Sequence, residues 1–490
     1  MTTGERIEQE SGTGIPGLIA AESPCDVLDR ERRWDVVTSL TVVIAGLLGL
    51  AFALLMPPFQ FNDEHAHFAR SYQISHGEFV GRPDPKLPSA VLATLLRYPE
   101  GFEYKSAPRT SVDNLFAGGS GGSTNSEPLG NIQGLRFFSH GILASQVYWT
   151  ACYLPASVGI RVARLLNMST VSMLYAARLM NLLSFLAALA IAQFLAPNFR
   201  ALTTAVALMP MTLQQAVAVS ADSMTIAFSF IGFALILYTR EHPVSHRYLA
   251  IVFFAVPLWV LCKNSLWALP LVLLIPVSQF GGKARRASFV LGVTLVTMIA
   301  VLSWRAMTSA AFAQYAAADL SRGVDFYANA RLLAAHPFKI IGDLIIPSGL
   351  QTCIPNVIHQ FIGTFGWGFN LLPLSFPYLG MLLGVACTEL SPKPFMIVER
   401  AILFGIFVAA LIQTYAMLFV IDGASGSGHY GFKAAGVQGR YFIPFCLAGF
   451  LAIRQKSITL PSRILAPIVL FVSTLCALLS LAVINGFFYA

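Results

Sequence analysis

Apolar runs of about 20 residues, the length that crosses a bilayer as a helix, recur along this chain. Of its 490 residues, 56% are hydrophobic and only 11% are charged. The mean hydropathy is +0.67, which is too apolar for a soluble protein of this size. We therefore expect an all-α polytopic membrane protein with about eleven transmembrane helices. The expected spans are residues 36–56, 174–196, 201–219, 224–239, 248–262, 265–280, 288–306, 373–390, 401–421, 441–453 and 464–486.

Basic residues predict the orientation of these helices, because Lys and Arg collect on cytoplasmic loops. Arg30, Arg32 and Arg33 precede the first apolar run, so residues 1–35 are expected to form a cytoplasmic tail. No small-residue cleavage site follows that run, which indicates a retained helix and not a signal peptide. The net charge of +8 is explained by such loops without nucleic-acid binding. The expected cytoplasmic turns contain Arg200, Arg240 to Arg247, Lys283 to Arg286, Lys393 to Arg400 and Arg454 to Arg463.

The external segments are expected to carry the functional residues. Residues 57–173 form the largest external loop, with short interfacial helices and a flexible Gly- and Ser-rich insert at 117–126. Its last part, His140 to Leu166, either crosses the membrane or lies flat, and the positive-inside rule favours the flat helix. Helices 2–7 are then expected within residues 174–306, an external loop at 307–372, and helices 8–11 within 373–490 with an external loop at 422–440.

The stretch Pro57 to Tyr72 places charges directly after the first apolar run. If its second half is helical, Asp63, His67 and Arg70 share one face, with Glu64 beside them. A carboxylate in this position could take a proton from an attacking hydroxyl group. The alternative is a solvated interfacial loop in which the same side chains only face water.

Metal binding at this stretch stays open in the sequence. Asp63, with Asp222 as a second acid, could bind a divalent cation such as Mg²⁺ or Mn²⁺. His65 and His67 add ligand atoms, but residues at i and i+2 diverge on a helix. The seven cysteines are widely scattered, with no spacing typical of a zinc site or a disulfide framework.

Four further charged residues lie at the ends of apolar runs. Asp222 either caps the following helix or converges on Asp63 as a second acid. Lys263 either snorkels to the interface or binds a phosphate group. Arg440 heads an apolar run on the external side, where basic residues are sparse, and an arginine there requires an anionic partner. Arg178 has a similar position but could simply pair with an acid.

Aromatic residues and glycines alternate from Phe361 to Phe369. An interfacial aromatic belt explains this pattern, and a platform for a sugar ring, formed by Trp367 and Phe365, explains it equally well. The chain has no Walker A loop, no Gly-x-Ser-x-Gly motif and no His-Glu-x-x-His motif. ATP-driven transport within the chain is therefore not expected.

These motifs resemble a bacterial membrane-protein family known as domain of unknown function 2142. The resemblance covers most of the chain after residue 40, and it departs at His65, where the family pattern more often has proline. The matching residues are Pro57-Pro58, Asn62 to Phe68, Gly77, Ser220 to Asp222, Lys263, Phe361 to Trp367, Leu372-Pro373, Gly436 to Tyr441 and Pro444.

That family is similar to the GT-C class of polytopic glycosyltransferases, which use polyprenyl-phosphate-linked sugars and carry a catalytic acid in the first external loop. The resemblance implies that Asp63 is the catalytic base, supported by Glu64 and His67, and that Asp222 is a second-loop acid. Lys263 and Arg440, with Arg178 as a third candidate, would neutralise the phosphate leaving group.

The sequence thus leads to the expectation of an inverting glycosyltransferase in the bacterial inner membrane, with its active face on the periplasmic side. Its expected partners are a polyprenyl-phosphate-linked sugar, a glycan, lipid or protein acceptor, and membrane lipids. Two alternatives remain: a transporter or flippase of a lipid-linked glycan, and a noncatalytic subunit of envelope assembly. A transporter should carry ionisable residues near the middle of several helices, whereas here most charges lie at helix ends.

Overall fold

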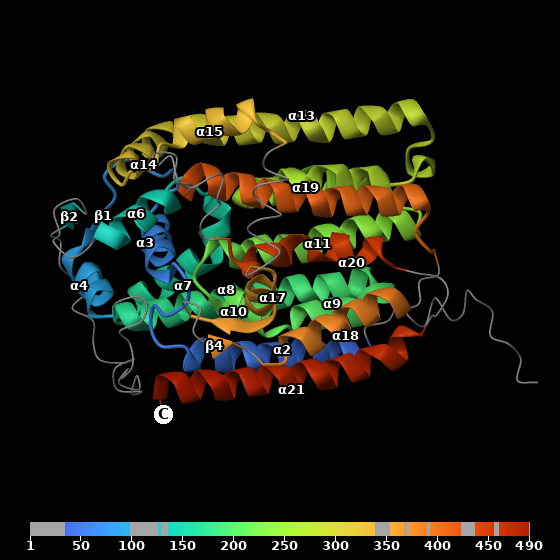
Figure 1. The fold of residues 1–490 in the computed structure, drawn as a ribbon, viewed down its shortest axis with the longest axis horizontal. Helices are drawn as coiled ribbons and strands as arrows, with labels where there is room; N and C mark the ends of the chain where they lie inside the picture. The colour runs from blue at the N-terminus through green and yellow to red at the C-terminus, as the bar shows by residue number, and fades with distance from the viewer. Residues whose placement is uncertain are drawn as a thin grey trace, which may run out of the picture.

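The computed structural model describes residues 35–98, 126–128, 136–338, 353–366, 370–371, 373–389, 393–422, 437–454 and 460–489. Long helices run side by side along the longest axis of the molecule (Figure 1). Within the described residues, seven helices are long and apolar enough to cross a membrane, so an all-α polytopic membrane protein is confirmed. They are α2 (Val36–Leu55), α8 (Thr170–Leu195), α11 (Ala221–Glu241), α12 (His246–Leu261) together with the turn that continues it to Asn264, α13 (Lys283–Met307), α19 (Ile397–Asp422) and α21 (Ser462–Tyr489).

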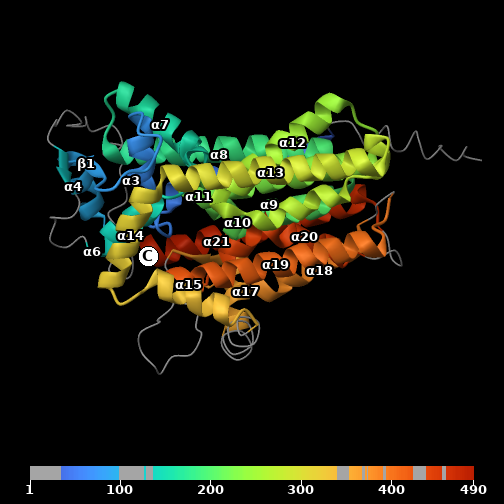
Figure 2. The same ribbon diagram turned by 90° about the horizontal axis from the view of Figure 1, so that it is seen from above.

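Packing of apolar side chains between these helices forms the core. Phe52 of α2 and Phe185 of α8 are fully buried, and the ring of Phe185 meets Phe230 of α11 edge to face at 5.8 Å. On α13, by contrast, Leu302 is 67% exposed, in keeping with a helix along the top edge of the bundle in Figure 1, which lies in front of the other helices when the bundle is seen from above in Figure 2. Large apolar side chains exposed along such a helix fit a surface that faces lipid.

The expected count of about eleven spans is not reproduced, since seven helices meet the length and composition criteria within the described residues. Residues 201–219 form two short buried helices that follow one another, and Pro210 starts the second of them. Residues 265–280 form 3₁₀ helices around Pro270. Proline removes a backbone donor and interrupts an α-helix, so these two apolar stretches do not form single long helices.

The shorter helices near these breaks complete the bundle. Two expected spans, 373–390 and 441–453, correspond to apolar helices of 10–17 residues. The short elements are η3 (Pro197–Phe199), α9 (Arg200–Ala207), α10 (Pro210–Val217), η4 (Cys262–Asn264), η5 (Leu266–Leu274), η6 (Val277–Phe280), α18 (Ser375–Thr388), η8 (Gly439–Phe445) and α20 (Cys446–Ala452).

At one end of the bundle, short helices cover the ends of the long ones, and we call this end the site end. Helices α3 and α14 run across the bundle axis there (Figures 1 and 2). The short elements between α2 and α8 are α3 (Glu64–Ser75), β1 (Lys86–Pro88), α4 (Ser89–Arg97), β2 (Ser126–Pro128), α6 (Arg136–Ser145), η2 (Thr150–Tyr153) and α7 (Leu154–Leu165). The later ones are α14 (Ser309–Ser321), α15 (Phe326–Ala335), α17 (Cys353–Gly363), β3 (Thr364–Phe365) and β4 (Asn370–Leu371).

The strands form two small antiparallel pairs. In the first, Leu87 of β1 lies opposite Glu127 of β2, and in the second, Thr364 of β3 lies opposite Leu371 of β4. Residues 140–166 fold as parts of α6 and α7 with η2 between them, and none of these is among the seven long apolar helices. The tail at 1–34 and almost all of the insert at 117–126 lie outside the described residues.

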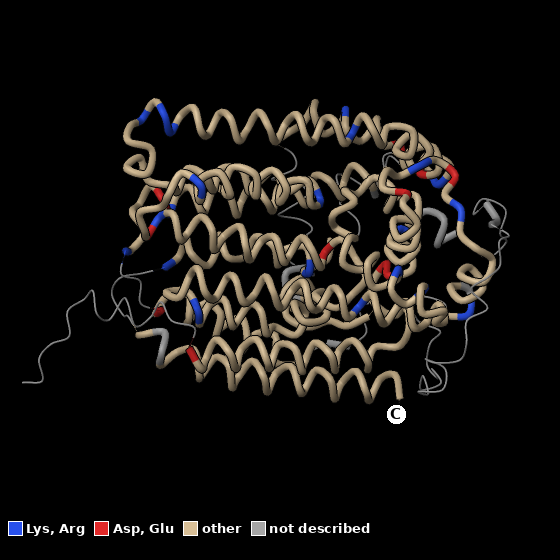
Figure 3. The backbone as a smooth tube through the Cα atoms, turned by 180° about the vertical axis from the view of Figure 1, so that it is seen from behind, with Lys and Arg blue, Asp and Glu red and all other residues tan. Residues whose placement is uncertain are grey.

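The opposite end of the bundle holds most of the basic turns that the sequence indicated. Arg240 forms an ion pair with Glu399 at 2.8 Å, and Arg200 forms one with Asp35 at 2.7 Å. Most charged residues lie toward the two ends of the molecule, and a smaller group of red and blue segments lies between them (Figure 3). This distribution fits a protein whose middle layer lies in hydrocarbon.

Candidate functional site

Four charged residues from distant parts of the chain meet at the site end: Asp63, Asp222, Lys263 and Arg440, here called the four-charge cluster. Arg440 donates from Nη2 to Oδ2 of Asp63 at 2.6 Å. Lys263 donates from Nζ to Oδ1 of Asp222. The other oxygen of Asp222, Oδ2, lies 4.0 Å from Nε of Arg440 and so links the two pairs. Two carboxylates and two cations give the cluster a formal charge near zero.

Burial differs across the four-charge cluster. The side chains of Arg440 and Asp222 are each 4% exposed, that of Lys263 is 20% exposed, and that of Asp63 is 45% exposed. Nε of Arg440 is buried and makes no hydrogen bond. A buried guanidinium with an unused donor has capacity for a further anionic partner.

Two residues of the cluster owe their direction to an unusual backbone conformation. Asp63 has φ 60° and ψ 13°, and Lys263 has φ 53° and ψ 29°, both in the left-handed region. Asp63 therefore precedes α3. The expected helix over 63–72 would instead have placed Asp63 in the first turn. Non-glycine residues adopt this conformation rarely, and such residues cluster at functional sites.

The geometry around Asp222 also differs from a simple helix cap. Ser220 is the capping residue of α11, and its hydroxyl oxygen accepts from the backbone N–H of Asp222 at 3.2 Å. Asp222 lies in the first turn of α11, where the helix dipole stabilises a carboxylate. Its side chain is therefore free to contact both cations of the cluster.

Arg440 is positioned by a close approach of two chain segments. A Cβ atom on Gly439 would lie 2.2 Å from the carbonyl oxygen of Val357 and 2.3 Å from the backbone nitrogen of Phe361. The N–H of Gly439 also donates to Oε1 of Gln360 at 3.0 Å. Only glycine lets η8 pack this tightly on α17, and this contact sets the position of the next residue, Arg440.

Two titratable groups at the start of α3 have shifted pKa values. Burial by itself would raise the pKa of Asp63, but the charge of Arg440, the hydrogen bond from Arg440 and the charges of neighbouring groups such as Lys263 together outweigh it and hold the pKa below its ordinary value of 3.8. Burial lowers the pKa of His67 to about 4, so the imidazole is neutral at pH 7. Its Nδ1 lies 2.8 Å from the hydroxyl oxygen of Tyr153. Asp63 is thus an ionised carboxylate beside an uncharged histidine.

Glu64 and Arg178 lie apart from the four-charge cluster and pair with each other. Both side chains are fully buried, and Arg178 donates to the two oxygens of Glu64 at 2.9 and 2.6 Å. The remaining donors of Arg178 reach the carbonyl oxygens of Ala53, Met56 and Pro57, at 2.8, 2.8 and 3.0 Å.

The contacts of this pair argue against the roles expected for its two residues. The guanidinium of Arg178 has all five donors occupied, so it is not available to a phosphate group. Oε1 of Glu64 also accepts from the backbone N–H of Val219, at 3.3 Å. The pair joins the end of α2 to α3, to α8 and to the segment before α11. It is a structural joint that positions Asp63.

Other residues singled out in the sequence also have structural contacts. Arg70 donates to the carbonyl oxygens of Glu78 and Phe79, so it does not share a functional face with Asp63. Phe365 is fully buried, and its ring lies 5.8 Å from that of Phe52, which removes it as a sugar platform. Trp367 lies outside the described residues.

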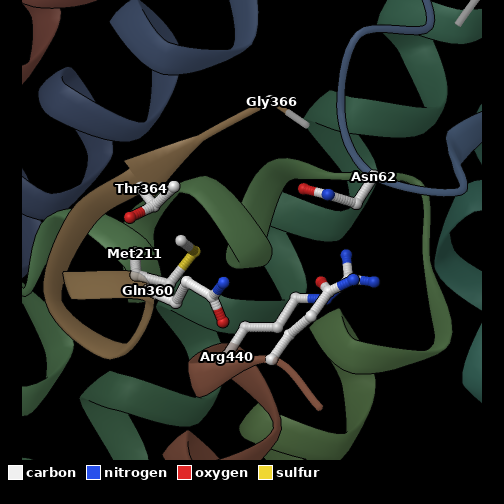
Figure 4. Close-up of a pocket in the computed structure, with 7 residues that line it drawn as sticks. Asn62, Met211, Gln360, Thr364, Gly366 and Arg440 are labelled. Atoms are coloured by element: carbon white, nitrogen blue, oxygen red, sulfur yellow. The ribbon is translucent and has the colours of Figure 1, made fainter. Parts of the chain in front are cut away.

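A small cavity adjoins the four-charge cluster. Its volume is about 80 Å³, and Asn62, Gln360 and Arg440 point toward one another across it (Figure 4). Thr364 also lines the cavity, and its buried hydroxyl oxygen makes no hydrogen bond. Sequence reasoning did not identify Gln360 or Thr364, because an uncharged polar residue in an apolar chain carries no signal of what lies across the fold.

The donor set does not fit a divalent cation in this arrangement. Asp63 and Asp222 each already contact a cationic side chain. Among the residues that the structure describes, no group of three His, Cys, Asp or Glu side chains is placed to hold a metal ion. Mg²⁺ and Mn²⁺ prefer several oxygen ligands, which these two paired carboxylates do not supply.

The helical bundle and the buried charges at its end define a polytopic all-α membrane protein with a charged site where the long helices stop. The family model of predicted membrane proteins called DUF2142 matches residues 47–449, and the chain belongs to this family. This finding confirms the resemblance seen in the motifs. No curated protein and no solved structure gives a significant match.

Proposed function

We propose that this protein is an inverting, GT-C-type glycosyltransferase that moves a sugar from a polyprenyl-phosphate-linked donor to a glycan, lipid or protein acceptor in cell-surface polysaccharide or glycoconjugate assembly. The observation that carries the proposal is the 2.6 Å contact between the half-exposed carboxylate of Asp63 and the buried guanidinium of Arg440. Transfer from a phosphate requires a base at the acceptor and positive charge at the leaving group. The four-charge cluster contains both.

In the proposed reaction, the carboxylate of Asp63 accepts the proton of an acceptor hydroxyl group. The acceptor oxygen attacks the anomeric carbon from the face opposite the phosphate, and a new C–O bond forms with inversion. The bond between the anomeric carbon and the phosphate oxygen breaks, and its electron pair leaves with the polyprenyl phosphate. Arg440 and Lys263 stabilise the negative charge that develops on this phosphate.

The Asp63–Arg440 pair also suggests how the base becomes active. Arg440 holds the pKa of Asp63 below its ordinary value, and a carboxylate with a low pKa is a weak base. A donor phosphate that contacts Arg440 would partly neutralise the guanidinium, so Arg440 would lower the pKa of Asp63 less. The carboxylate would then gain basicity when the donor is in place. Neutral His67 lies beside this carboxylate, and Glu64 acts indirectly by holding Arg178 and the start of α3.

A transporter or flippase for a lipid-linked glycan is the second candidate, and a noncatalytic assembly subunit is the third. The position of the charges favours the enzyme over the transporter, because most of them lie toward the two ends of the molecule and only a smaller group lies between (Figure 3). Transporters place ionisable residues near the middle of several spans. The enzyme alone requires the carboxylate of Asp63 as a base.

Complementation of a deletion strain tests the proposal. The strain should receive the wild-type protein, Asp63→Asn or Arg440→Ala, with membrane levels of each protein measured in parallel. We expect the wild type to restore a cell-envelope glycan and both variants to fail at equal membrane levels. A full glycan profile with Asp63→Asn, in a strain that depends on the wild type, would reject the enzyme.

We place the proposed enzyme in the bacterial inner membrane, with residues 1–35 in the cytoplasm and the site end facing the periplasm. The basic residues at the opposite end support this orientation. A reporter fused after Thr170 should give a periplasmic signal. A cytoplasmic signal at that position would reverse the orientation.

A further inference from the structure

A second, larger cavity lies at the other side of the four-charge cluster. Its volume is about 280 Å³, and its wall contains two cations, Lys263 and Arg305, with no acidic residue among the described residues that line it. Lys263 belongs to both the cluster and the cavity wall, since its Nζ contacts Asp222. Arg440 lines the small cavity and lies next to the same Asp222. The two cavities are therefore joined through one chain of ion pairs.

Seven of the sixteen other residues that line the larger cavity are aromatic. Tyr148, Trp149, Trp304 and Tyr327 line it, together with side chains from the ends of α12, α13 and α19. Nζ of Lys263 lies 5.8 Å from the ring centre of Tyr148, a distance at which a cation and an aromatic face attract each other. Aromatic faces with nearby cations suit a ligand that combines a sugar ring with a phosphate group.

A continuous apolar surface leads along α13 toward this cavity. Leu295, Ile299 and Leu302 are 53%, 63% and 67% exposed, and their spacing places them on one face of the helix. Trp304 and Arg305, which line the cavity, follow directly. An isoprenoid chain in the lipid phase can lie along such a surface while its phosphate reaches Arg305 and Lys263.

We propose that the two cavities divide the substrates: the larger binds the sugar of the polyprenyl-linked donor, and the smaller binds the hydroxyl-bearing ring of the acceptor. The donor phosphate extends from the larger cavity to the four-charge cluster where the two cavities meet, so that Lys263 and Arg440 both face it. This assignment rests on the proposed transferase function and deepens it. It makes Arg305 a donor-binding residue and Thr364 an acceptor-binding residue.

The reverse assignment, with the donor in the smaller cavity and the acceptor in the larger one, agrees less well with the residues that line the two cavities. The smaller cavity contains the amides of Asn62, Gln360 and Gln438, which donate and accept hydrogen bonds, as sugar hydroxyl groups do. The buried, unpartnered hydroxyl of Thr364 adds a further group for such a ligand. Asn62 also directly precedes Asp63, so an acceptor held there lies beside the proposed base.

Binding of decaprenyl phosphate to the purified full-length protein in nanodiscs tests the donor cavity. We expect Arg305→Gln to weaken binding at least about tenfold, since a charge-assisted contact is lost. Thr364→Val and Arg331→Gln should bind as the wild type does. Arg331 is exposed on α15 and does not line the cavity, so Arg331→Gln controls for the loss of one surface charge.

Three further probes separate the possible sources of the binding signal. Decaprenol lacks the phosphate, and inorganic phosphate lacks the isoprenoid chain. Phosphatidylglycerol is an anionic lipid that has a phosphate but no isoprenoid chain. All three should bind more weakly than decaprenyl phosphate. Equal binding of inorganic phosphate would indicate a simple anion site, and equal binding of phosphatidylglycerol would indicate a general lipid site. Either result would overturn the assignment.

The outcomes also separate this inference from the proposed function. Binding that is lost in Thr364→Val but retained in Arg305→Gln would reverse the cavities and leave the transferase proposal standing. Asp63→Asn should retain decaprenyl phosphate binding while glycan transfer is lost. If Asp63→Asn keeps full transfer, the transferase proposal fails although the lipid site remains. Thermal unfolding of each variant, with Arg305→Lys as the charge-conserving comparison, shows whether a loss of binding reflects a loss of fold.

Discussion

Asp63 and Arg440 form a 2.6 Å ion pair although 377 positions separate them in the chain. Asp63 directly precedes α3, just after the first spanning helix, and Arg440 lies in η8, before the last two helices. Their contact closes the bundle at the site end and places a part-exposed carboxylate beside a buried cation. The function proposed here depends on this contact more than on any other.

Replacing the carboxylate alone should separate function from folding. Asp63→Asn keeps the size and shape of the side chain but removes the base, and general base catalysis contributes roughly 10²- to 10⁴-fold to a rate. We expect glycan transfer in membranes to fall by about that factor. The melting temperature of the purified variant should stay near that of the wild type, because the carboxylate is half exposed. A variant that unfolds early would instead make Asp63 a structural residue.

Gly439→Ala should displace Arg440 through a steric clash. The new Cβ atom would lie 2.2 Å from the carbonyl oxygen of Val357, and backbone atoms cannot move aside easily. We expect lower thermal stability and loss of function. Gly384→Ala is the matched control, because a Cβ on Gly384 in α18 meets nothing within 4 Å. That variant should be as stable as the wild type or more so, since alanine favours a helix over glycine.

Glu64→Gln should destabilise the protein strongly, unlike Asp63→Asn. Removing one partner of a fully buried ion pair leaves the guanidinium of Arg178 uncompensated, and such changes cost roughly 3–5 kcal/mol. The measurement is thermal or denaturant unfolding in detergent. Arg331→Gln removes the charge of an exposed arginine on α15, and it should change stability by no more than about 0.5 kcal/mol. Equal effects of the two variants on stability would contradict the structural role of the buried Glu64–Arg178 pair.

Mild acid should weaken the fold through His67. Its pKa is about 4 in the folded protein and 6.5 in its ordinary state, so between these values the unfolded chain binds a proton that the folded chain does not. Stability is therefore complete above pH 6.5 and is lost as the pH falls toward 4. The difference corresponds to roughly 3 kcal/mol at most.

His67→Asn tests this pH effect. The asparagine amide can replace Nδ1 in its contact with Tyr153 but does not titrate in this range. Between pH 6.5 and 4.5, the melting temperature of the variant should fall less than that of the wild type. Asp63 stays ionised in this window because its pKa lies below 3.8, so it does not mask the comparison. Parallel curves for the two proteins would show that His67 does not control the acid response.

Much of the architecture could be predicted from the sequence, because hydrophobicity acts locally along a chain in a membrane. The apolar runs predicted an all-α polytopic protein, and the motifs predicted the family; both predictions are confirmed. The expected number of spans is not confirmed, and proline shortens the helices of two expected spans, at Pro210 and Pro270. Composition averages over a window and does not register a single missing backbone donor.

The candidate site could be predicted only in part. Charge next to an apolar run is rare, so Asp63, Asp222, Lys263 and Arg440 stood out in the sequence, and the structure brings these four together. Glu64 stood out for the same reason, but its partner is Arg178. Adjacent positions give no sign of which acid will be fully buried and which will stay half exposed.

The sequence by itself determined that this chain must fold as membrane-crossing helices with its few charges near their ends, because unpaired charge is expelled from hydrocarbon. Only the tertiary structure decided which charges meet. The left-handed backbone at Asp63 and the close approach at Gly439 direct two side chains toward each other across the bundle. Such contacts depend on how distant helices pack, and no local pattern of residues encodes that packing.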